Sequence, residues 1–210
     1  MPKSGIGTAF SIDENGTWLT ARHVVDGCDE VGLNIGRGQI IAAETSLSQK
    51  SDIGVLKTKW HRKAMAHDIA NPRRVGEHGF FIGFPQGRPG EAIGQLIGRN
   101  KMRISGRYKT EETVLAWAEL GRTRGLKGSL GGMSGGPVLD ADGEVIGIVA
   151  AESPRRGRIY SVAPQSMQGF VPKANENENF TLEDDTFGLH ADKLRRERRI
   201  TQVICIVKDS

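Results

Sequence analysis

The six residues 132–137, Gly-Met-Ser-Gly-Gly-Pro, restrict the fold more than any other stretch of the chain. Glycine destabilises a helix and tolerates positive φ, and proline lacks the backbone N–H that a helix interior needs. The apolar run Val145–Val149 follows closely, so the turn is predicted to connect strands of a sheet. Standing alone, the motif would indicate only a glycine-rich hairpin, because serine is common in turns.

Short apolar runs separated by turn residues continue along most of the chain, which is typical of an all-β protein. The 28 glycines and the 6% aromatic content agree with many turns between short strands. Five strands are predicted before residue 58, at Ile6–Ile12, Trp18–Thr20, Val31–Ile35, Gln39–Leu47 and Ile53–Lys57. Six more are predicted after residue 77, at Phe80–Pro85, Ala92–Ile104, Thr113–Glu119, Val138–Asp140, Glu144–Ala151 and Arg158–Val162.

The segments outside these strands are interpreted as connections. Residues 58–77 are read as a linker between two units, residues 175–179 as a polar loop and His190–Arg199 as a helix. His61 and His67 lie in the linker without the cysteine or glutamate pattern of a metal site, so no metal and no other cofactor is expected.

Length and charge narrow the classes of function. A chain of 210 residues suits one two-layered domain or a pair of small barrels. The net charge of +4 indicates no dedicated nucleic-acid surface, and the basic run Leu194–Arg199 is read as a solvated helix face. No stretch approaches the ~20 apolar residues of a membrane helix, and Met1–Ser4 leads into the first strand without a signal peptide. The chain as written is expected in the cytoplasm, or in the periplasm or outside the cell if an export signal was removed.

Three polar residues, each beside an apolar β-like run, supply the chemistry that the serine turn lacks by itself: His23, Asp52 and Ser134. A serine hydroxyl needs a base to take its proton, and the base needs a carboxylate to hold its tautomer. The order His, Asp, Ser is that of chymotrypsin-like enzymes, whereas α/β-hydrolases have the order Ser, acid, His. The sequence therefore predicts Ser134 as the nucleophile, His23 as the general base and Asp52 as the acid that orients it.

These segments resemble the catalytic motifs of trypsin-like serine proteases, most closely those of bacterial HtrA-like enzymes. The resemblance covers roughly residues 5–171 and implies two six-stranded antiparallel barrels, followed here by a short C-terminal helix and strand. It also implies a serine endopeptidase that hydrolyses polypeptides through an acyl-enzyme. The alternative is a catalytically inactive relative that serves as a binding module, although all three triad positions are filled.

The resemblance further predicts how the chain is divided. Residues 1–77 would form the first barrel and the linker, residues 78–171 the second barrel, and residues 172–210 a C-terminal tail. This tail is too short for the PDZ domain that follows the protease domain in HtrA-like proteins. A monomer is therefore favoured over a cage-forming oligomer.

The resemblance implies that the backbone N–H groups of Gly132 and Ser134 form the oxyanion hole. Glycine at position 132 fits, because such a donor needs an unusual backbone conformation. Met133 departs from the family pattern, since digestive trypsin-like enzymes carry an aspartate there and HtrA-like proteins usually carry an asparagine. That aspartate pairs with a new N-terminus after zymogen cleavage. Methionine forms no ion pair, so this mode of activation is not expected.

Three segments frame the specificity pocket in this family. They correspond here to Gly128 and Ser129, to Ala150, Ala151 and Glu152, and to the strand that carries Arg158 and Tyr160. Position 128 is not an aspartate, so a preference for Lys or Arg is not supported. Two possibilities stay open. The pocket is uncharged and takes small or medium apolar side chains, or Arg158 enters it and selects acidic ones.

Residues 200–207 form a strongly β-forming run without an obvious place. The family has a strand before the one at Ile6–Ile12, and residues 2–5 are too short to supply it. We predict that residues 200–207 return to lie beside Ile6–Ile12 and Val31–Ile35, because a missing strand would leave unpaired edges. The alternatives are a disordered tail, a strand that pairs with a partner subunit, or a chain trimmed at its start. The predicted place brings Cys205 near Cys28, and whether the two are bonded or remain two small buried residues is left open.

Overall fold

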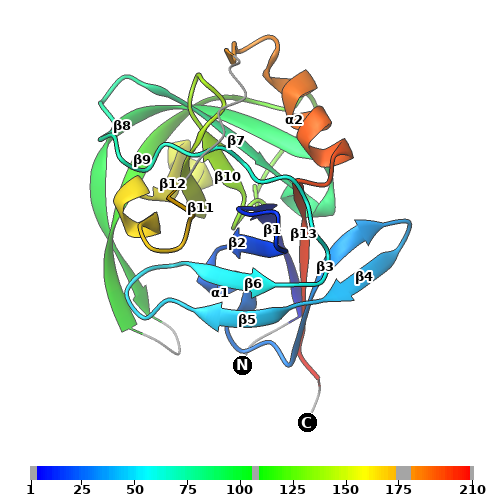
Figure 1. Ribbon diagram of the computed structural model, residues 1–210. Helices are drawn as coiled ribbons and strands as arrows, with labels where there is room; N and C mark the ends of the chain where they lie inside the picture. The colour runs from blue at the N-terminus through cyan, green and yellow to red at the C-terminus, as the bar shows by residue number, and fades with distance from the viewer. Residues whose placement is uncertain (1–3, 106–108, 174–180, 209–210) are drawn as a thin grey trace.

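The computed structural model describes residues 4–105, 109–173 and 181–208. A closed six-stranded barrel, in the order β10-β11-β12-β9-β8-β7, lies beside a seven-stranded sheet in the order β4-β3-β13-β1-β2-β6-β5 (Figure 1). The predicted all-β fold of two units is confirmed. The first unit differs in detail, because it is a curled open sheet rather than a closed six-stranded barrel.

The curled sheet is open because its two edge strands are not hydrogen-bonded to each other. Its first six strands are β1 (Gly5–Ser11), β2 (Thr17–Thr20), β3 (Glu30–Gly36), β4 (Gln39–Ala42), β5 (Glu44–Leu47) and β6 (Gly54–Lys57). The single strand predicted over residues 39–47 is divided at Ala43, since β4 pairs with β3 and β5 pairs with β6. β4 and β5 are the two edges of the sheet. The covalent chain, and not a ladder of hydrogen bonds, therefore joins them.

The C-terminal strand β13 (Ile200–Ile206) completes this unit. It lies between β1 and β3 and is antiparallel to both (Figure 1), which is the place that the sequence predicts for it. The side chains of Ile200 and Val203 in this strand are buried. Cys205 forms a disulfide with Cys28, with Cα atoms 5.4 Å apart, so the question left open for the two cysteines is answered by a bond.

The closed barrel contains the six strands predicted for it. They are β7 (His78–Gly83), β8 (Gly90–Ser105), β9 (Lys109–Arg122), β10 (Pro137–Leu139), β11 (Val145–Ser153) and β12 (Arg158–Val162). In the core, Trp117 meets Phe81 edge-on, and its indole N–H donates to Ser161 Oγ at 2.9 Å, so its polar atom is satisfied. β8 and β9 are the longest strands, and their hairpin reaches beyond the barrel along the curled sheet (Figure 1).

The predicted C-terminal helix is α2 (Phe187–Arg196), which begins and ends three residues earlier than the sequence pattern indicates. Phe187 packs against Phe80 of the barrel, with ring centroids 4.9 Å apart, and this contact favours the early start. Arg198 has a φ of +58°, which a helix does not accept, so the helix ends before it.

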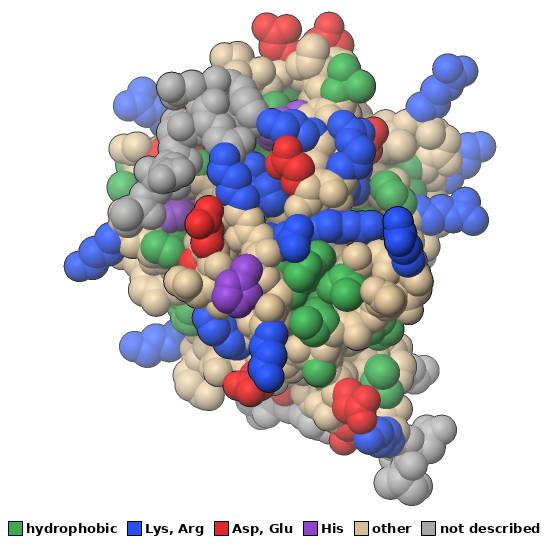
Figure 2. All heavy atoms as spheres, turned by 45° about the vertical axis from the view of Figure 1, so that its right-hand side comes forward, with side chains coloured by type: hydrophobic (Ala, Val, Ile, Leu, Met, Phe, Trp, Pro, Cys, Tyr) green, Lys and Arg blue, Asp and Glu red, His purple; other side chains and the backbone are tan. Residues whose placement is uncertain are grey.

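The interpretation of residues 194–199 as a solvated basic face is wrong for two of its arginines. Arg195 is only 7% exposed, and its guanidinium donates to the carbonyls of Gly83 at 3.0 Å and Gly90 at 2.7 Å. Arg199 is buried as well and donates to the carbonyl of Ala64. On the face that carries α2, acidic side chains lie among the basic ones (Figure 2). Arg195 therefore attaches α2 to the barrel, and Arg199 attaches the segment after the helix to the linker.

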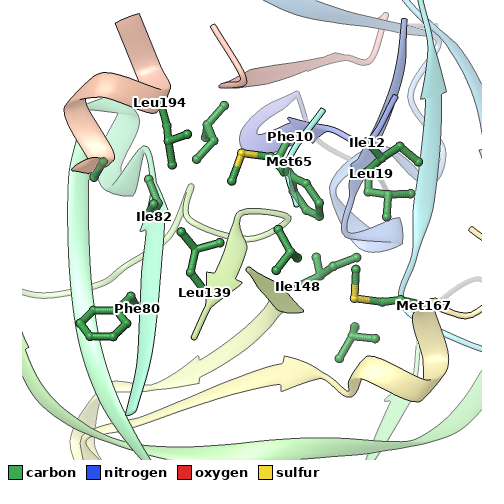
Figure 3. Close-up of a cluster of buried hydrophobic side chains, with 14 of the residues drawn as sticks. Phe10, Ile12, Leu19, Met65, Phe80, Ile82, Leu139, Ile148, Met167 and Leu194 are labelled. Atoms are coloured by element: carbon green, nitrogen blue, oxygen red, sulfur yellow. The ribbon is translucent and has the colours of Figure 1, made fainter. Parts of the chain in front are cut away.

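One apolar cluster joins the two units. Phe10, Ile12 and Leu19 from the curled sheet meet Ile82, Leu139 and Ile148 from the barrel, and Met65 of the linker and Leu194 of α2 lie among them (Figure 3). Close packing of this kind fixes how the units sit against each other. Loops at this seam are therefore held in a defined arrangement.

The remaining helical segments are short: α1 (Arg22–Val25), η1 (Pro85–Gly87), η2 (Pro154–Arg156) and η3 (Pro164–Met167). No helix in the described ranges is long and apolar enough to span a membrane. The polar loop predicted at residues 175–179 lies outside the described residues. The boundaries predicted after residues 77 and 171 stay predictions.

Candidate active site

His23 and Asp52 are joined by two hydrogen bonds at the seam between the units. His23 lies in α1, directly after β2, and Asp52 lies in the loop between β5 and β6. His23 Nδ1 is 2.7 Å from Asp52 Oδ2, and the backbone N–H of His23 donates to Asp52 Oδ1 at 2.9 Å. Asp52 is fully buried, whereas 39% of the His23 side chain is exposed. The carboxylate thus holds one ring nitrogen, and part of the imidazole stays exposed.

The serine turn packs against the strands that precede this pair. The backbone N–H of Thr8 in β1 donates to the carbonyl of Ser134 at 2.8 Å. A Cβ on Gly135, whose φ is +85°, would lie 2.2 Å from both Thr8 O and Thr20 Oγ1, so only glycine fits there. A Cβ on Gly7 would meet Val24 at 2.4 Å and the carbonyl of Ser134 at 3.1 Å. The structure therefore brings Ser134 beside the residues that flank His23.

The peptide that joins Gly131 to Gly132 is held by a backbone hydrogen bond. The carbonyl of Gly131 accepts the backbone N–H of Gln86 at 2.6 Å. Because a trans peptide points its C=O and N–H in opposite directions, the N–H of Gly132 points away from Gln86. Gly132 has a φ of +98°, and Thr8 Oγ1 donates to its carbonyl at 2.8 Å. Within the described ranges, the backbone N–H groups of Gly132 and Ser134 have no acceptor, so both are free to bind one.

Gln86 supports this loop from the turn between β7 and β8, and sequence reasoning missed it. Its side-chain amide donates to the carbonyls of Lys127 at 2.7 Å and Ser129 at 2.9 Å. Its backbone has a φ of +54°, which is uncommon outside glycine and occurs where the surrounding structure imposes it. The Pro-Gln-Gly segment is typical of a turn, but its local pattern does not identify the partners of Gln86.

Met133 is fully buried in the apolar core of the barrel, among residues such as Phe81 and Val138. The position where related enzymes carry a polar residue is therefore filled by an apolar side chain. The loop around it is held instead by Thr8, Gln86 and Glu152. This supports the expectation that activity does not depend on an N-terminal ion pair, which stays a prediction.

The predicted pocket residues are brought together only in part. Ser129 Oγ and the backbone N–H of Leu130 donate to the carboxylate of Glu152, the latter at 2.8 Å, so two of the three predicted walls are joined. Ala151 lies opposite Tyr160 in the β11–β12 ladder. Gly128 has a φ of +76°, and its carbonyl accepts Arg122 Nη1 at 2.8 Å.

Two predicted pocket residues point elsewhere. The guanidinium of Arg158 donates to the carbonyls of Arg156 and Gly157, which belong to its own turn. Ala150 is 5% exposed and belongs to the apolar cluster between the units. The interpretation that Arg158 enters the pocket therefore loses support, and the pocket itself stays a prediction.

One group of side chains in the described ranges has the spacing of a metal site: Asp68, Asp140 and Glu144, with ligand atoms within 4.8 Å of one another. Arg73 already places its guanidinium on this group, with Nη1 3.2 Å from Asp140 and Nη2 on Asp68. The arginine supplies the positive charge that the carboxylates need. Of the two linker histidines, His67 is half-buried, and its Nε2 lies 3.0 Å from the carbonyl oxygen of Pro172.

The sequence of this chain is similar to those of known proteins. A family model described as a trypsin-like peptidase domain matches residues 7–148. The protein y4bJ of Sinorhizobium fredii is 28% identical over 85% of this chain and 26% of its own length. A probable periplasmic serine endoprotease, DegP-like, of Chlamydia muridarum is 27% identical over 69% of this chain and 28% of its own length. The chain thus spans about a quarter of these relatives.

Solved structures of proteases share the fold. The active form of the Rv3671c protease from M. tuberculosis superposes with a TM-score of 0.63, covering 79% of this chain and 78% of that one. The sequences are 16% identical, so this likeness establishes the arrangement of strands and nothing more.

Proposed function

This chain belongs to the trypsin-like peptidase family, and from that premise we propose that it is a serine endopeptidase that cleaves polypeptides through an acyl-enzyme. The observation that carries the proposal is the His23–Asp52 pair, with the serine turn packed against its flanking residues. A buried carboxylate on one ring nitrogen leaves the other nitrogen able to take a proton. The His23–Asp52 pair therefore supports a general base at this position.

In the proposed reaction, Ser134 Oγ attacks the carbonyl carbon of the scissile peptide bond while His23 takes the hydroxyl proton. Asp52 stabilises the imidazolium that results. The carbonyl oxygen becomes negative and binds the backbone N–H groups of Gly132 and Ser134, which is worth about 3 kcal/mol per donor. The imidazolium then gives its proton to the leaving amine. A water molecule, activated by the same histidine, hydrolyses the acyl-enzyme.

The alternative is an inactive relative that binds peptides without cleaving them. Such a protein needs neither an oriented His–Asp pair nor free oxyanion donors. The free N–H groups of Gly132 and Ser134, together with the peptide held by Gln86, therefore favour an active enzyme. Both hypotheses share a polypeptide partner, and neither involves nucleic acid.

We further propose that the protein works in an oxidising compartment, such as the periplasm. Disulfides persist there and are rare in the cytosol, and this chain has one between Cys28 and Cys205. The DegP-like relatives are described as periplasmic. Of the locations expected from the sequence, the periplasm or the outside of the cell is therefore favoured over the cytoplasm.

A fluorophosphonate probe combined with a peptide library tests the proposal. We expect the probe to attach covalently at Ser134, which mass spectrometry of the digested protein locates, and the library to be cleaved. The cleavage profile also tests which side chains the predicted specificity pocket accepts. We expect small or medium apolar side chains before the scissile bond, and the same profile in the variant Arg158→Ala. A protein that binds peptides but neither cleaves them nor reacts with the probe would be the inactive module.

Gln86→Ala is expected to lower kcat/KM by about 10- to 100-fold, because it removes two hydrogen bonds that hold the oxyanion loop, each worth about 1 kcal/mol. Steady-state kinetics on a cleaved library peptide measures the effect. Gln95→Ala is the matched control, since its amide donates to the carbonyl of Gly76 at an exposed site. Equal rates for both variants would show that Gln86 does not support the site.

A further inference from the structure

Glu112 is a buried carboxylate that the proposed reaction does not use. It lies near the start of β9, and its contact with Asp52 connects the long β8–β9 hairpin to the curled sheet. Its Oε2 accepts the backbone N–H of Asp52 at 2.8 Å, and the residue is 5% exposed. Its Oε1 is buried, and the side chain of Ser166 in η3 lies close enough to the carboxylate to act on its pKa. The barrel thus contributes one polar contact to the triad acid of the other unit.

The charge of Glu112 responds to pH near neutrality. Burial raises the pKa of its carboxyl to about 7, and the negative charge of Asp52 adds to that rise. Hydrogen bonds from the Asp52 backbone and from the Ser166 side chain of η3 oppose it. Asp52 is the charged group that faces it from the β5–β6 loop, and the carboxylate of Asp52 is in turn hydrogen-bonded to His23 of α1. Met102, opposite it on β8, is uncharged.

We propose that Glu112 is a positioning residue of the triad, which fixes the backbone of Asp52 and, when ionised, adds a negative charge behind the His23–Asp52 pair. This inference rests on the proposed peptidase function. It assigns a second carboxylate to the site, supplied by the barrel.

The physical reason is the charge that develops during acylation. His23 becomes an imidazolium when it takes the proton of Ser134, and a carboxylate in a buried setting stabilises that cation. A neutral Glu112 keeps its hydrogen bond to Asp52 but adds no charge. Glu112 should therefore accelerate the reaction above neutral pH and have little effect below pH 6.

Glu112→Gln separates the charge from the contact, because glutamine keeps an acceptor for the Asp52 N–H and removes the ionisation. The rate constant for inactivation by a fluorophosphonate is measured from pH 5 to 9. We expect the ratio of wild type to variant to be close to one at pH 5 and to rise, with a midpoint near the pKa of about 7, to about tenfold at pH 9. Glu111→Gln is the matched control on the same strand, since Glu111 is exposed and pairs with Lys101.

Stability supplies a readout that needs no activity. A carboxyl whose pKa is raised in the folded state destabilises the fold as pH rises from its unfolded value of 4.5 through about 7. The free energy of unfolding of wild type should therefore fall relative to Glu112→Gln over that range, as urea titrations at pH 5 and pH 8 would reveal. Identical pH dependence in the two proteins would mean that Glu112 does not titrate there.

The outcomes distinguish this inference from the function on which it rests. A ratio that is the same at every pH, in a wild type that reacts with the probe, would overturn the role of Glu112 alone. A wild type that does not react at any pH would overturn the peptidase function, and with it any catalytic role for Glu112. Glu112→Leu, which also removes the acceptor, should lower the rate at every pH.

Discussion

Replacing Ser134 with alanine is expected to lower kcat on the order of a million-fold and to abolish fluorophosphonate labelling, while the fold stays intact. The variant loses the nucleophile, and what remains is the stabilisation from the oxyanion donors and substrate binding. His23→Ala should be about as damaging. Because the two residues act as one unit, the double variant should be little slower than either single one.

The matched controls use residues of the same types away from the site. Ser46→Ala on the exposed edge strand β5 and His61→Ala in the linker should keep full activity and labelling. Circular dichroism of each variant checks that the fold is unchanged. Labelling that survives in Ser134→Ala would assign the nucleophile to another residue, and additive losses in the double variant would argue against a coupled pair.

Deleting residues 200–210 is expected to unfold the curled sheet and to abolish activity with it. The deletion removes β13 and leaves β1 and β3 as unpaired edges. Ile200 and Val203 are buried and contribute about 1.5–3 kcal/mol each. The disulfide to Cys28 closes a separation of 177 residues and contributes about 2–5 kcal/mol. These losses together approach the whole stability of a typical domain, about 5–15 kcal/mol.

Urea denaturation followed by tryptophan fluorescence measures this effect, because Trp18 is buried in the curled sheet and Trp117 in the barrel. A deletion of residues 208–210, which leaves β13 whole, is the control. The double substitution Cys28→Ser and Cys205→Ser isolates the disulfide and should weaken the fold without abolishing it. A protein lacking residues 200–210 that is as stable and as active as the full chain would contradict the prediction.

Local patterns determined much of the fold and the choice of reactive residues. The spacing of apolar runs and turn residues predicted all six strands of the barrel, because each strand's own side chains must fit the two faces of a sheet. The order of His23, Asp52 and Ser134 identified the candidate triad. Counting strands against the family even predicted where Ile200–Ile206 pairs, since an unfilled edge in a curled sheet is costly.

The tertiary structure decided the features that depend on segments far apart in the chain. The sequence left open whether Cys28 and Cys205 are bonded, and it read Arg195 as solvated although the barrel carbonyls bind it. It was silent on Gln86 and Glu112, whose partners lie 41 and 60 residues away along the chain. A polar side chain in a strand or turn has the same local pattern whether it meets water or a buried backbone group. Only the packing of the two units determines which of these it meets.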